Sequence, residues 1–361
     1  MYMITDKIDL VTPLFANRCP QQAESGADVL TIGSDFGLSK WDEAACNSDN
    51  VILLTDSSRV CHYLQYPEET TLIYSYFESL GSKYDKTLFF GLQYILKKWM
   101  VGPVITVKKI NDAKEFFRVH FNQELFNESG WMHIVEQHDG HLPLSIRAAP
   151  EGSLIPTRNV LFTVENTDPA LPWLTGWFQT LLMQTWYPTT VATNAWHYKE
   201  LLARYLVETC GSTASIPYQL HDFGFSGASS AESAAIGGAA HLVNFLSSDN
   251  IAGIRFVNQY YGFPMAGYSY PSTEHSDGMT LEMAEAVLAN AKANRWSAQN
   301  VLLASDGTLM REPRGPAQRF AFQCSAAVVG GHEVILCGVC FLPLANPKLI
   351  EYTLALSLHD T

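Results

Sequence analysis

The second half of the chain alternates short strands with helices, and this alternation constrains the fold more than any other feature. Tyr218–Phe223 has the composition of a strand, a Gly/Ser-rich turn follows, and a helix is expected over 231–245. A second unit of this kind is expected from Ile251, and a third joins the helix Leu281–Trp296 to the strand Val301–Leu303. Helices that link successive strands lead to a parallel sheet or barrel. The sequence therefore predicts an α/β fold here.

The first half is richer in β-forming residues. Val51–Leu54, Leu72–Phe77 and Val160–Val164 are strand candidates, because β-branched and aromatic residues dominate them. Leu92–Trp99 has apolar residues at helical offsets. So does 111–121, where Asn111 is the expected helix cap.

Two further segments predict helices of different burial. Leu174–Trp186 is almost wholly apolar and is expected to be buried. Trp196–Cys210 carries Leu201, Leu202, Tyr205 and Leu206 on one stripe, which is typical of an amphipathic helix.

Charge and cysteine usage exclude several classes of protein. The 361 residues include 23 Lys and Arg against 36 Asp and Glu, a net charge of −13, so we expect neither a nucleic-acid nor an anionic-membrane partner. Seven scattered cysteines argue against a disulfide framework and for a reducing, cytoplasmic setting. The Cys337/Cys340 pair is the only close pair; without a second such pair or a nearby pair of histidines, two buried thiols explain it better than a metal or redox role. We expect no signal peptide and no membrane span.

Three positions place polar groups where ligands collect in βα folds. His221–Phe225 ends a strand before the loop 226–230, which either binds phosphate or caps a helix. Asp249 follows an apolar helix, as a ligand contact or a turn residue. His275 lies between Glu274 and Ser276, and is an acid, a base, a phosphoacceptor or a structural histidine. No metal ligands are assigned.

Together with their neighbours, these segments resemble the nicotinamide phosphoribosyltransferase family over 51–276, with a weaker match from Asp277 to His359. The words that carry the resemblance follow one another in the family's order: Leu54–Ser57, His62–Pro67, Tyr74–Glu78, Phe90–Ile95, Asp139–Pro143, Asn159–Pro169, Trp186–Pro188, Thr190–Asn194, His221–Gly224, Gly237–Phe245 and Glu274–Ser276.

The resemblance implies transfer of ribose 5-phosphate from phosphoribosyl pyrophosphate to nicotinamide, within NAD salvage, by a homodimer that uses Mg²⁺ and ATP. Phe223 matches the ring that stacks on nicotinamide, and Asp249 matches the carboxylate that accepts from its amide. His275 matches the histidine that ATP phosphorylates. Further substrate-binding positions by resemblance are Tyr218, His221, Asp277, which matches a ribose contact, and Gly307 in the phosphate loop.

The implied fold is a type II phosphoribosyltransferase-like α/β fold, α+β overall. Residues 1–50 form a weakly structured extension, 51–210 with 320–361 form a β-rich mixed α/β domain, and 211–319 form a truncated βα barrel. The barrel is truncated because the family has a long stretch of βα units between the positions of Ser276 and Asp277, and this chain has none of it.

Other departures fall on the phosphate side of the site. Ser58 replaces an aromatic residue, Leu80 and Ser226 replace arginines, Asp306 brings negative charge to the phosphate loop, and the run 349–355 is not basic. These losses leave two alternatives open beside the transferase. One is an inactive truncated paralogue or isoform that dimerises with a full-length enzyme; the other is a nicotinate or related pyridine transferase, which Asp249 disfavours.

Overall fold

A computed structural model describes residues 50–81, 83–269, 281–300, 303–305 and 320–335. The extension predicted for 1–50 lies outside these ranges apart from Asn50. No helix within them is both long and apolar enough to cross a membrane.

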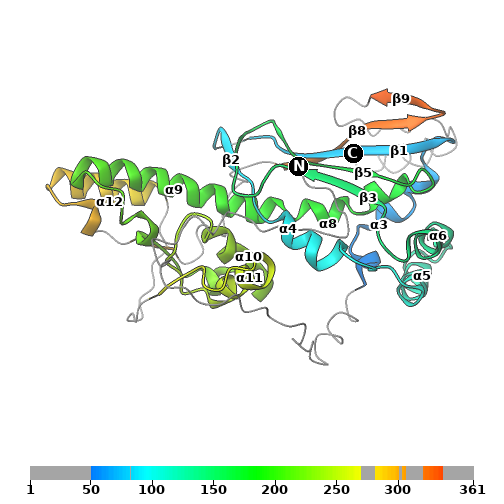
Figure 1. The fold of residues 1–361 in the computed structure, drawn as a ribbon, viewed down its shortest axis with the longest axis horizontal. Helices are drawn as coiled ribbons and strands as arrows, with labels where there is room; N and C mark the ends of the chain where they lie inside the picture. The colour runs from blue at the N-terminus through cyan, green and yellow to red at the C-terminus, as the bar shows by residue number, and fades with distance from the viewer. Residues whose placement is uncertain (1–49, 82, 270–280, 301–302, 306–319, 336–361) are drawn as a thin grey trace, which may run out of the picture.

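Three strands of the first half and two strands from 320–335 form a five-stranded antiparallel sheet (Figure 1). Its order is β3 (Leu144–Ala148), β5 (Val160–Asn166), β1 (Thr70–Ser79), β8 (Phe320–Val329) and β9 (His332–Ile335). The strands predicted around 72–77 and 160–164 are confirmed. Phe77 lies opposite Phe162 in the β1–β5 register, and their buried rings stack with centroids 4.8 Å apart.

The first predicted strand is wrong. Val51–Leu53 forms a 3₁₀ turn, η1, because the Asn50 side chain accepts a hydrogen bond from the Ile52 N–H at 3.1 Å and starts a turn. Short elements complete this region: α3 (Ser57–Val60), η2 (His62–Leu64), and the pair β2 (Lys86–Leu88) with β4 (Leu154–Pro156).

Helices cover the sheet and enclose an aromatic core. They are α4 (Leu92–Ile95) with a π-helical turn η3 (Leu96–Met100), α5 (Val107–Phe121), α6 (Glu128–His138), α7 (Trp173–Trp177) and α8 (Gln179–Met183). Trp131 meets Trp173 and Trp177 edge to face, with centroids 5.0 Å apart in both pairs. The cap predicted at Asn111 is wrong, because Thr106 accepts from the Lys109 N–H and starts α5 one turn earlier.

A 25-residue helix, α9 (Trp186–Cys210), links the two halves of the chain. The apolar segment before it is buried as predicted through Leu182, but it folds as α7 and α8, and Trp186 is exposed. Leu202, Tyr205 and Leu206 are buried on one side of α9, which confirms the amphipathic stripe. The helix α12 (Leu281–Ala293) lies alongside α9, and η6 (Ala298–Asn300) also packs on it.

The second half contains parallel strands, as predicted. After η4 (Ile216–Tyr218), β6 (Leu220–Asp222) pairs in parallel with β7 (Leu303–Ser305). On the other side of β6, Asp222 forms a parallel bridge to Ser248, and Ser247 forms one to Tyr268. Four short segments therefore lie side by side as an arc.

The helices of this half are α10 (Ala231–His241) and α11 (Ile251–Tyr261), with η5 (Gly224–Gly227) before α10. The second unit does not start with a strand at Ile251. The Asn250 side chain accepts a hydrogen bond from the Gly253 N–H at 3.1 Å and begins α11, much as Asn50 begins η1. The strand pairing lies earlier, at 247–248. The mixed α/β class is confirmed. The division into three parts stays a prediction.

Two glycines set the distance between α10 and α11. A Cβ added at Gly253 would lie 2.8 Å from the Gly238 Cα and 2.9 Å from its carbonyl carbon. Backbone atoms cannot rotate away, so the two helices approach this closely only without side chains there.

We expect Gly253→Ala to destabilise the protein by about 1–3 kcal/mol, because the helices must separate. Chemical denaturation followed by circular dichroism measures the change. Gly176→Ala in α7 is the control, since its Cβ would meet only the Tyr66 hydroxyl, at 3.1 Å. Equal stability of the two variants would contradict the close approach.

The His197 side chain of α9 makes stability depend on pH. Its ring stacks on Tyr84 with centroids 3.6 Å apart, and its Nε2 is buried without a hydrogen-bond partner among the described residues. Burial lowers the pKa of His197 to about 4; the nearby Asp85 charge raises it by a smaller amount, and the Lys83 charge lowers it slightly further. The unfolded chain therefore takes up this proton first as the pH falls from about 6.5.

Between pH 6.5 and 4, we expect wild type to lose about 1–3 kcal/mol of stability relative to His197→Phe, which keeps an aromatic ring and cannot titrate. Urea unfolding at several pH values measures the difference. Parallel pH profiles for the two proteins would refute this assignment.

Candidate functional site

Three neighbouring parallel segments end in polar side chains that meet. His221 belongs to β6, Asp249 follows the bridged Ser248, and Ser269 follows the bridged Tyr268. His221 Nε2 lies 2.8 Å from Asp249 Oδ1 and 3.4 Å from Ser269 Oγ, and the Ser269 hydroxyl donates to the same Asp249 oxygen. Because the carboxyl ends of parallel strands share one edge, the topology itself assembles this cluster.

Phe223 adds an aromatic ring to the cluster. It follows β6 directly, and its ring centroid lies 4.8 Å from that of His221 at an interplanar angle of 41°. The turn that carries it is fixed by Asp222, whose buried Oδ1 accepts from the Gly224 N–H at 2.7 Å. The structure therefore brings together three of the predicted residues, His221, Asp249 and Phe223.

The electrostatics favour an ionised Asp249. Its side chain is 33% exposed, whereas that of His221 is 1% exposed. Burial raises the pKa of Asp249, but hydrogen bonds from Ser269 and His221 outweigh this effect and leave the pKa below its ordinary value. Both bonds fall on Oδ1, and no described residue donates to Oδ2. A ligand amide could therefore donate to that oxygen.

The other predicted residues are not brought to this cluster. Tyr218 lies in η4 at the amino end of β6, with 49% of its surface exposed, and no described hydrogen bond or ring contact joins it to His221 or Asp249. His275, Asp277 and Gly307 lie outside the described residues, so their roles stay predictions, as does any role of Cys337/Cys340.

The described part of the site offers two carboxylate oxygens without a described donor, Asp249 Oδ2 and Asp222 Oδ2, as oxygen ligands of the kind that Mg²⁺ prefers. Asp249 Oδ1 is bound by two donors and Asp222 Oδ1 holds the Gly224 N–H. Within the described ranges, the one group of three His, Cys, Asp or Glu side chains close enough to share an ion lies elsewhere. Two of the departures from the family, Ser58 in place of an aromatic residue and Ser226 in place of an arginine, are exposed.

Sequence reasoning missed two residues of this site, Ser269 and Asp222. Ser269 lies between two tyrosines, and nothing in the spacing of this segment signals a parallel bridge. Asp222 lies within the His221–Phe225 word. Its carboxylate is buried and its Oδ2 has no hydrogen-bond partner among the described residues.

Comparisons with known proteins agree with this organisation. Residues 50–146 match the model of the nicotinamide phosphoribosyltransferase N-terminal domain, and residues 218–313 match that of the nicotinate phosphoribosyltransferase (NAPRTase) family. A nicotinamide phosphoribosyltransferase of Xanthomonas campestris is 48% identical over 229 residues, covering 63% of this chain and 48% of the relative. The chain is thus similar to nicotinamide phosphoribosyltransferases over its first half and to the wider pyridine phosphoribosyltransferases over 218–313.

Another nicotinamide phosphoribosyltransferase, from Acinetobacter baylyi, is 34% identical over 248 residues, again covering 63% of this chain and 48% of the relative. The chain thus spans about half the length of the curated relatives it matches. Among solved structures, human nicotinic acid phosphoribosyltransferase is 20% identical with a TM-score of 0.40, covering 60% of this chain and 39% of that one. Nicotinate-nucleotide pyrophosphorylase from Pyrococcus furiosus is 10% identical with a TM-score of 0.41, covering 85% and 81%. Neither likeness is close enough to assign an activity.

Proposed function

We propose that this chain is a nicotinamide phosphoribosyltransferase of NAD salvage. In this reaction the nicotinamide ring nitrogen forms a bond to the anomeric carbon of phosphoribosyl pyrophosphate, and the bond from that carbon to the pyrophosphate oxygen breaks. The bonding electrons leave with pyrophosphate, and the other product is nicotinamide mononucleotide. The matched family models and the relatives' names support this reaction and do not favour the inactive paralogue.

The observation that carries the proposal is that the Asp249 carboxylate and the Phe223 ring both contact His221. A flat, neutral ring stacks on an aromatic side chain, and a carboxylate oxygen accepts a hydrogen bond from a primary amide. The same negative charge repels the carboxylate of nicotinate. His221 and Ser269 hold Asp249 Oδ1, so that the orientation of the carboxylate is fixed before the ligand binds.

The remaining parts of the proposal rest on the resemblance and lie outside the described residues. His275 would accept phosphate from ATP, Asp277 would contact the ribose, and Gly307 would lie in the phosphate loop. We include Mg²⁺, a homodimer and a cytoplasmic location in the proposal. The seven scattered cysteines support the location, because two of them, Cys61 and Cys210, are free in the described part.

Purified full chain, incubated with Mg²⁺, ATP, phosphoribosyl pyrophosphate and nicotinamide, is expected to form nicotinamide mononucleotide. Chromatography of the products measures it. Asp249→Asn should lower kcat/KM for nicotinamide by about tenfold or more, because an amide accepts less strongly than a carboxylate and can turn its NH₂ to the ligand.

Asp112→Asn, on the exposed side of α5, is the matched control and should leave kcat/KM unchanged. Absence of product at saturating substrates would refute the proposed activity. Equal use of nicotinate and nicotinamide would refute the role of Asp249.

A further inference from the structure

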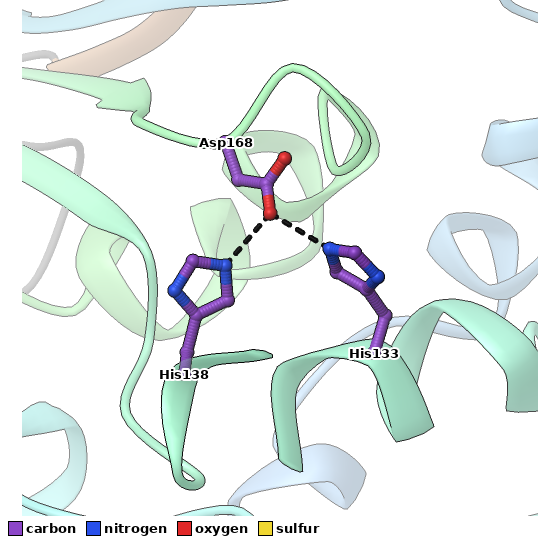
Figure 2. Close-up of side chains that lie close together, drawn as sticks. All are labelled: His133, His138 and Asp168. Atoms are coloured by element: carbon purple, nitrogen blue, oxygen red, sulfur yellow. Dashed lines mark hydrogen bonds and ion pairs between the residues drawn. The ribbon is translucent and has the colours of Figure 1, made fainter. Parts of the chain in front are cut away.

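Three potential metal-ligating side chains converge on elements that contribute nothing to the site described above. His133 and His138 come from α6, and Asp168 comes from the loop between β5 and α7. Figure 2 shows both imidazoles pointing at one carboxylate oxygen. Asp168 Oδ2 lies 2.8 Å from His133 Nε2 and 2.7 Å from His138 Nε2.

The surrounding hydrogen bonds fix the carboxylate in place. Asp168 Oδ1 accepts from the Ala170 N–H at 2.8 Å, and the Asp168 carbonyl accepts from Asn166 Nδ2 at 2.8 Å. The same Asn166 side chain accepts from the Ile73 N–H of β1 at 2.8 Å, which ties the loop to the centre of the sheet. Such outer partners orient the ligands of metal sites.

We propose that His133, His138 and Asp168 bind a divalent transition-metal ion of the Zn²⁺ or Co²⁺ class. Two imidazoles and one carboxylate form a ligand set that such ions prefer, whereas Mg²⁺ prefers oxygen ligands alone. The site is therefore distinct in chemistry and place from any Mg²⁺ at the transferase site, and it does not depend on the proposed activity.

The geometry needs little change to admit an ion. Zn²⁺ bound at about 2.0–2.1 Å by tetrahedral ligands holds its ligand atoms roughly 3.3 Å apart. The two N···O separations are slightly shorter than this, and all three ligand atoms lie within 4.8 Å of one another. Small rotations of the imidazoles make room for the ion, and each Nε2 offers its lone pair once the ring proton is on Nδ1.

The charge and exposure of the three groups suit an ion that enters from solvent. Burial alone would raise the pKa of Asp168, but hydrogen bonds from His138, the Ala170 N–H and His133 lower it to about 2. The carboxylate is therefore ionised at neutral pH. All three side chains are partly exposed, at 34%, 29% and 16% for His133, His138 and Asp168.

A cavity of about 470 Å³ adjoins the cluster. His133 lines it, together with Tyr63, Tyr66, Asn127 and residues 169–173. Three protein ligands leave one position of a tetrahedral ion open. A water molecule or a small ligand in this cavity can occupy that position.

The test is titration of the purified, chelator-treated full chain with ZnCl₂ by calorimetry, and with CoCl₂ by visible absorption. Wild type should bind one equivalent of metal more than His138→Gln, or bind that equivalent about 10- to 100-fold more tightly. Removing even an outer partner of a metal ligand causes a loss of affinity of this size. Saturating Zn²⁺ should also raise the melting temperature of wild type but not of the variant.

Asp168→Asn is the second variant, because it retains an oxygen that can accept from the Ala170 N–H and tests the site if His138→Gln fails to fold. The control is His120→Gln, which removes an exposed imidazole of α5 that bonds Ser57. Unchanged stoichiometry and affinity in both ligand variants would overturn the proposal and leave the cluster as two imidazole N–H groups that donate to one carboxylate.

Discussion

The parallel alignment of β6 with residues 247–248 and with Tyr268 is the constraint on which the site depends. Its backbone hydrogen bonds run from the Asp249 N–H to the Asp222 carbonyl at 2.9 Å and from the Ser248 N–H to the Tyr268 carbonyl at 2.9 Å. Shifting any one segment by a single residue would turn its side chains to the opposite face. This register places the His221 imidazole against Asp249 and Ser269. The close contact of α10 with α11 at Gly238 and Gly253 packs the helices that connect the segments.

Secondary structure was predictable where one physical signal dominated. The alternating burial of β1 and the apolar stripe of α9 are periodic over several residues, so the sequence indicated both elements. The errors arose where a single hydrogen bond decides. Asn50 turns an apolar segment into η1, and Thr106 starts α5 before the expected Asn111. A local pattern does not reveal which of several polar side chains reaches the backbone.

The site could be predicted from the sequence where residues that match the family also lie at the ends of predicted strands or helices. His221 and Phe223 end a predicted strand, Asp249 follows a predicted helix, and all three match site positions of the family. The structure brings them together. Ser269 joins them only through the bridge of Tyr268 to Ser247, a pairing too short to leave a sequence signal. His133, His138 and Asp168 escaped notice for a related reason: the carboxylate lies 30 residues from the nearer histidine, and the fold alone unites them.

The central claim is that the arc of parallel segments builds a recognition site for the neutral nicotinamide ring. Direct binding of nicotinamide tests this claim separately from turnover. Calorimetric titration of the full chain with nicotinamide and with nicotinate is the measurement. The account predicts that nicotinamide binds at least about tenfold more tightly, because Asp249 repels the acid, and that Asp249→Asn removes this preference. Equal affinities for the two ligands in wild type, or no binding of either, would contradict it.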